Sequence, residues 1–72
     1  MKTYHFIVKF LNDDMSYHGE FDTPYDTQGK ILKDAKVILN EKLPQWKYTS
    51  DQIISYEIYT DDTRETVYHW KK

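Results

Sequence analysis

Histidines and carboxylates are the side chains of this chain that could carry out acid–base chemistry. The alternating pattern of the first 22 residues predicts a hairpin in which His5 lies across from Glu20. A histidine oriented by a carboxylate can act as a general base. The chain offers no identifiable nucleophile for such a pair, and opposite charges on facing strands commonly stabilise a sheet without a catalytic role. We therefore expect no catalytic residue and no enzyme activity.

Metal and nucleotide chemistry find no support in the spacing of the relevant residues. His5, His18 and Glu20 follow no metal-ligand motif, and His69 is distant in the sequence. The two Asp-Asp turns lack the spaced carboxylates of an EF-hand loop. With only two glycines, the chain contains neither a P-loop nor a dinucleotide-binding fingerprint. We expect no metal, no cofactor and no small-molecule substrate.

The first hairpin follows from a period of two in the apolar residues. The strands are expected at residues 3–11 and 15–22, with a polar turn between them. Keeping both apolar sets on one face pairs Phe10 with Met15, Val8 with Tyr17, Phe6 with Gly19 and Tyr4 with Phe21. Gly19 opposite Phe6 would then either let the ring of Phe6 lie over bare backbone or mark a bulge.

One amphipathic helix is expected from Gln28 to Leu43. Its apolar positions recur at helical spacing and are Ile31, Leu32, Ala35, Ile38, Leu39 and Leu43. Asp26 and Thr27 are candidate caps. Pro44 disfavours helical geometry in the residue before it, so the helix is expected to end near Leu43.

A second hairpin is expected from Ile53–Thr60 and Thr66–Trp70, with Ile54, Tyr56 and Ile58 on the more apolar face of its first strand. A three-residue turn at 61–63 would place Tyr68 opposite Tyr56 and Trp70 opposite Ile54. The order is ββαββ. It predicts an α+β fold in which two antiparallel hairpins form a sheet with the helix packed on one face, as a single domain over residues 1–72.

Composition restricts where the protein acts. The chain lacks cysteine, and residues 1–11 do not resemble a signal peptide, which favours a reducing cytoplasm. Nine lysines against one arginine, with a single alanine, indicate an AT-rich bacterial or phage genome. Small proteins of that kind are often accessory or inhibitor proteins.

The apolar surface exceeds the needs of one core. Twelve of 72 residues are aromatic, and the face of the sheet away from the helix is expected to carry apolar side chains among polar ones. The predicted partner-binding residues are Ile7, His18, Ile53, Tyr59 and Val67. Apolar groups rimmed by charge are typical of interfaces, so we expect a non-catalytic module that binds a protein partner or forms a homodimer.

Nucleic-acid binding is the alternative function. A lysine-rich helix face next to an aromatic loop could follow a phosphate backbone while bases stack on the rings. The residues of this alternative are Lys30, Lys33, Lys36, Trp46 and Lys47. The pI of about 5.8 lies far below the values typical of nucleic-acid-binding domains, so protein binding is the favoured interpretation.

Overall fold

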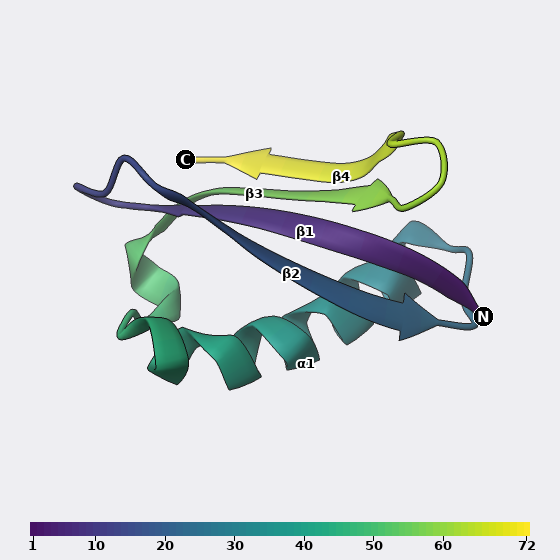
Figure 1. Ribbon diagram of the computed structural model, residues 1–72, viewed down its shortest axis with the longest axis horizontal. Coiled ribbons are helices and arrows are strands. Elements are labelled where there is room, and N and C mark those ends of the chain that lie inside the picture. Colours follow the sequence, from purple (N-terminus) through teal and green to yellow (C-terminus); the bar gives the residue numbers. More distant parts are fainter.

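The computed structural model describes all 72 residues and contains one four-stranded sheet with one long helix on one of its faces (Figure 1). The strands are β1 (Lys2–Phe10), β2 (Ser16–Thr23), β3 (Ile53–Thr60) and β4 (Thr66–Lys71); the helices are α1 (Gln28–Trp46) and the short 3-10 helix η1 (Ser50–Gln52). All neighbouring strands are antiparallel, in the order β2-β1-β3-β4. The predicted α+β class and ββαββ order are confirmed.

Strand β1 lies at the centre of the sheet and supplies much of the core. Its apolar side chains toward α1 are all buried, and they are Tyr4, Phe6, Val8 and Phe10. Helix α1 contributes a buried stripe of Ile31, Ala35, Leu39 and Leu43. These positions have the strand and helix periods expected from the sequence.

The register of the first hairpin confirms three of the four predicted pairs, namely Tyr4 with Phe21, Phe6 with Gly19 and Val8 with Tyr17. The β1–β2 ladder ends at Lys9 and Ser16, so the predicted pairing of Phe10 with Met15 does not form. Phe10 is paired only on its other side, with Ile53 of β3.

The register of the second hairpin differs from the prediction. Trp70 lies opposite Tyr56 and Tyr68 lies opposite Ile58, two residues along β3 from the predicted pairs. Two features account for the shift. The turn is longer than predicted and includes Arg64, whose φ is 60°. In addition, Ile58 pairs with Tyr68 and Tyr59 pairs with Thr66, so Val67 of β4 has no partner on β3.

Helix α1 also differs from the prediction at its C-terminal end. It passes through Pro44 and ends at Trp46, three residues beyond the expected end. Lys47 then adopts a left-handed conformation, and the N–H of Tyr48 donates to the carbonyl of Leu43. The last turn is retained because Trp46 packs against Phe10, with ring centroids 6.1 Å apart.

Candidate interaction surface

The face of the sheet away from α1 is called the open face below. The strand register arranges its side chains in three rows that cross all four strands. The first row is Ser16, Lys9, Ser55 and Lys71; the second is His18, Ile7, Glu57 and His69; the third is Glu20, His5, Tyr59 and Thr66. All three histidines of the chain therefore lie on this one face.

One apolar side chain, that of Ile7, occupies the middle of the open face. Ile7 is half-buried in the central row, where it is flanked by His18 and Glu57. Ile7 and Ile54 are the two apolar residues in the wall of a shallow hollow that also includes Lys9. The face thus combines an apolar centre with a polar and charged surround.

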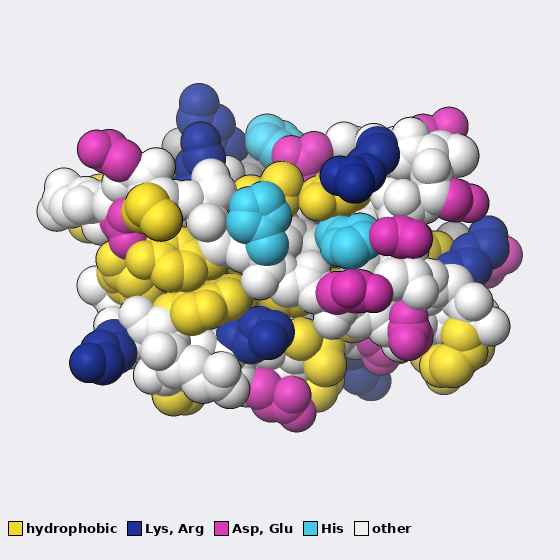
Figure 2. Space-filling view, in the orientation of Figure 1, with side chains coloured by type: hydrophobic (Ala, Val, Ile, Leu, Met, Phe, Trp, Pro, Cys, Tyr) yellow, Lys and Arg dark blue, Asp and Glu magenta, His cyan; other side chains and the backbone are white.

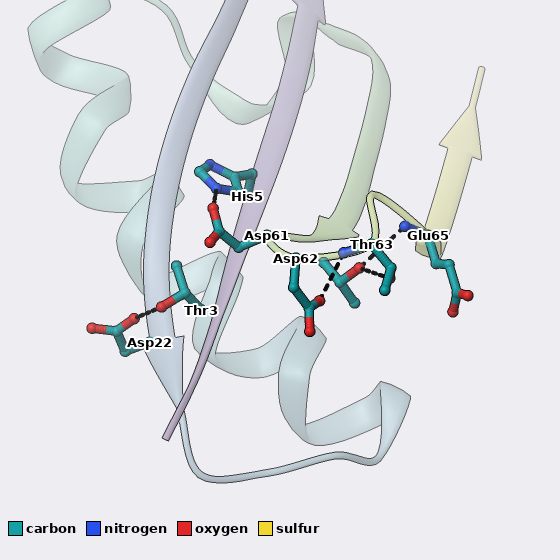
Figure 3. A network of polar contacts seen from close by, with 8 residues as sticks. Thr3, His5, Asp22, Asp61, Asp62, Thr63 and Glu65 are labelled. Carbon is teal, nitrogen blue, oxygen red and sulfur yellow. Dashed lines mark hydrogen bonds and ion pairs between the residues drawn. The ribbon is translucent and has the colours of Figure 1, made fainter.

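The third row ends in a network of polar contacts at the β3–β4 turn (Figure 3). The imidazole of His5 contacts the carboxylate of Asp61, although the register places Glu20 directly across from it, as predicted. The ring of Tyr59 stacks on His5 with centroids 5.3 Å apart, and the guanidinium of Arg64 lies 5.6 Å from the centre of the Tyr59 ring. These contacts fix the side chains at this end of the face.

A second contact in the same view joins Thr3 to Asp22, with the hydroxyl donating to the carboxylate at 2.6 Å (Figure 3). Neither in this network nor in the rest of the chain do three histidine, aspartate or glutamate side chains lie close enough together to hold a metal ion.

Ile7, His18 and Tyr59 lie on the open face as predicted, whereas Ile53 and Val67 do not. Both of these side chains pack against the core on the helix side. A register shift at Phe10 turns Ile53 inward and leaves Ile54 in the wall of the open-face hollow. The face assignments of Ile53 and Ile54 were therefore wrong.

Val67 is turned toward the core by the irregularity in the β3–β4 pairing. Its carbonyl accepts a hydrogen bond of 2.8 Å from the side-chain amide of Gln28, at the start of α1. The partner-binding role proposed for the residues of the open face stays a prediction.

The residues of the nucleic-acid alternative do not form one site. The indole of Trp46 is half-buried against Phe10 and Tyr17 rather than presented for stacking. Lys30 and Lys47 lie near opposite ends of α1, roughly 25 Å apart at 1.5 Å per residue. Lys33 and Lys36 are exposed between them. Nucleic-acid binding by these residues stays a prediction.

Asp13 lies beside the aromatic rings of Phe10 and Tyr17 and has two tyrosine partners, which no sequence pattern indicated. The carboxylate of Asp13 accepts hydrogen bonds from the hydroxyls of Tyr48 and Tyr17 and from the N–H of Met15. The bond from Tyr48 is the largest of the causes that lower the pKa of Asp13, and it raises the pKa of Tyr48 in return. The bond to Met15 is ordinary turn chemistry and could have been anticipated; the tyrosine contacts depend on the tertiary fold.

A groove on the helix side was also not anticipated. It has a volume of about 400 Å³, and its wall includes Leu32 and Lys36 of α1 and Tyr68 and Trp70 of β4. Tyr56 also lines it, and the hydroxyl of Tyr56 is buried without a hydrogen-bond partner.

Comparison with known proteins adds no family to this geometry. The chain matches no protein-family model, and neither a curated protein nor a solved structure shows significant similarity to it. No helix of the fold has both the length and the apolar character needed to cross a bilayer.

Proposed function

We propose that this chain is a non-catalytic interaction or inhibitor module that binds a protein partner, or a second copy of itself, through the open face. The observation that carries the proposal is the position of Ile7. It lies on a central strand, in the middle row of a sheet face on which no other element packs. Apolar side chains surrounded by charged ones are the usual composition of a non-obligate interface.

The scaffold supports this use of the face. Strand β1 is paired on both sides, and its opposite surface is locked into the core through Phe6 and Val8. Side chains on such a strand are held in fixed positions, so binding requires little ordering of the free protein. The absence of cysteine further supports a cytoplasmic site of action.

The experiment compares three immobilised forms of the protein as baits: wild type, Ile7→Glu and Val37→Glu. Val37 is an exposed apolar residue on α1, so its substitution adds the same charge away from the open face. We expect the partner to be captured by wild type and Val37→Glu and lost from Ile7→Glu, because a charge buried without a partner at an interface is costly. Circular dichroism checks that both variants are folded.

Two results would contradict the proposal. One is a partner that binds Ile7→Glu as strongly as wild type. The other is binding of a nucleic acid that weakens steeply with salt and is lost in a Lys30→Glu/Lys33→Glu variant, which would favour the alternative function.

A further inference from the structure

The open face carries a charge gradient along the direction of its strands. Lys9 and Lys71 lie in the first row, separated only by Ser55. At the other end, Glu20 lies in the third row, and Asp22 and Asp61 follow beyond it. Arg64 covers the ring of Tyr59 at the acidic end, and Lys2 lines the same hollow as Asp61, so carboxylates outnumber cations there without excluding them.

The surface of the molecule shows a partial separation of the two signs of charge, with some acidic side chains also at the left of the view and some basic ones also at the right (Figure 2). In Figure 2 acidic side chains are most frequent toward the right of the view, and basic side chains form a group at the upper left. In the same orientation, Figure 1 places the C-terminal end of β4 near that basic group. The middle row, with Ile7 between His18 and Glu57, lies between the two ends.

A face with this gradient is complementary to itself under one kind of symmetry. Consider a twofold axis that lies between two open faces and runs perpendicular to the strands. It reverses the order of the rows, so the basic row of one copy faces the acidic end of the other. The middle rows then face each other, with the two Ile7 side chains near the axis. A twofold axis parallel to the strands would instead place lysines against lysines.

We infer that the open face docks against the open face of a second copy, with the strands of the two copies running in opposite directions. This inference rests on the proposed function, which leaves the identity of the protein partner open. It uses the isologous contact that most homodimers adopt, in which the same surface serves both copies. The attraction between the basic row of one copy and the acidic end of the other sets the relative orientation of the two copies. The two Ile7 side chains provide the apolar centre of the contact.

The small size of the face sets the expected affinity. Four strands about 4.8 Å apart give a width of roughly 19 Å, which is modest for a protein interface. Interfaces at the low end of the size range are usually transient. We therefore expect a weak monomer–dimer equilibrium rather than a permanent dimer.

The test uses analytical ultracentrifugation of two variants, each of which reverses the sign of the charges at one end of the open face. Lys9→Glu/Lys71→Glu makes both ends acidic, and Glu20→Lys/Asp22→Lys makes both ends basic. Each variant alone should dimerise at least about tenfold more weakly than wild type, because like charges then face each other. An equimolar mixture should recover association, since each variant complements the other.

A matched control separates this effect from a change in net charge. Lys33→Glu/Lys36→Glu makes the same charge change as Lys9→Glu/Lys71→Glu, but on exposed positions of α1. It should dimerise as wild type does. Thermal melting of every variant shows whether the fold is retained; all of the substituted positions are exposed.

The inference is overturned if wild type stays monomeric up to about 1 mM, or if the variants dimerise as wild type does. It is also overturned if the two reversed variants fail to associate when mixed. The proposed function fails on a separate result, namely that Ile7→Glu retains every partner bound by Val37→Glu. A monomeric wild type that captures an Ile7-dependent partner would overturn the dimer and leave the proposed function standing.

Discussion

The ring of Phe6 lies against the bare backbone of Gly19, on the neighbouring strand. A Cβ placed on residue 19 would stand 2.2 Å from Cζ of that ring, which no real contact allows. Phe6 is fully buried, so it has no free space into which to move. We expect Gly19→Ala to lower the free energy of unfolding by roughly 1–3 kcal/mol, the usual cost of overpacking a core. Urea denaturation of the variant measures this loss.

Gly29→Ala is the matched control for that substitution. Gly29 lies in the first turn of α1, and a Cβ built on it meets no atom within 4 Å. Alanine favours a helix over glycine by up to about 1 kcal/mol, so this variant should be as stable as wild type or more stable. If Gly19→Ala unfolded at the same urea concentration as wild type, the close packing of Phe6 on Gly19 would be contradicted.

The carboxylate of Asp13 should make stability depend on pH in the acidic range. Hydrogen bonds from Tyr48, Met15 and Tyr17 hold its pKa below the ordinary value of 3.8. The folded protein therefore binds this proton less tightly than the unfolded chain does. The resulting stabilisation is present above pH 3.8 and is lost as the pH falls through the lower pKa of the folded state.

Asp13→Asn should accordingly be less stable than wild type at pH 7, and the difference should shrink below pH 3.8. Urea midpoints measured between pH 2.5 and pH 7 give the two curves. Asp14→Asn, at the exposed neighbouring position, serves as the control and should follow wild type throughout. Parallel curves for wild type and Asp13→Asn would show that the carboxylate makes no such contribution.

The hydroxyl of Tyr56 is expected to destabilise the fold. It is buried and has no hydrogen-bond partner, and burial raises its pKa, with a smaller contribution from Tyr68. An unsatisfied buried hydroxyl costs free energy, so Tyr56→Phe should raise the free energy of unfolding by about 1 kcal/mol. Tyr48→Phe is the contrasting variant, because its hydroxyl donates to Asp13, and it should be less stable than wild type. A Tyr56→Phe protein that is clearly less stable would indicate an unseen partner for the hydroxyl.

Regular periodicity explains which parts of this fold were predictable. The alternation of β1 and the helical spacing of α1 are local, and the residues of these patterns enter the core or, for Leu32 and Ile38, pack against it as half-buried side chains. The position of Gly19 opposite Phe6 followed from the same alternation. The order of the strands did not, because the pairing of β1 with β3 brings together segments more than 40 residues apart.

Irregularities account for the errors at the candidate site. A period of two assigns alternate residues to opposite faces only while the pairing is unbroken, and one extra residue exchanges the faces. The shift at Phe10 exchanges Ile53 and Ile54, and the shift at Tyr59 turns Val67 inward. The helix continues past Pro44 because the aromatic contacts of Trp46 outweigh the local preference, and those contacts are tertiary.

The last prediction concerns Ile53 and Ile54, which lie on the opposite faces of the sheet from those that regular alternation assigns to them. The two residues are adjacent, chemically identical and both half-buried, but Ile53 packs against the core while Ile54 lines the open-face hollow. We expect Ile53→Ala to lower the free energy of unfolding by roughly 1–3 kcal/mol, because it removes apolar contacts with the core. Ile54→Ala should cost less than roughly 1 kcal/mol, mostly through the weaker strand preference of alanine.

The effect on binding through the open face should be the reverse. Ile54→Ala should weaken this binding, whereas the folded fraction of Ile53→Ala should bind as wild type does. Urea denaturation combined with the ultracentrifugation assay measures both effects, and a larger loss of stability in Ile54→Ala would restore the regular alternation and contradict the register shift at Phe10.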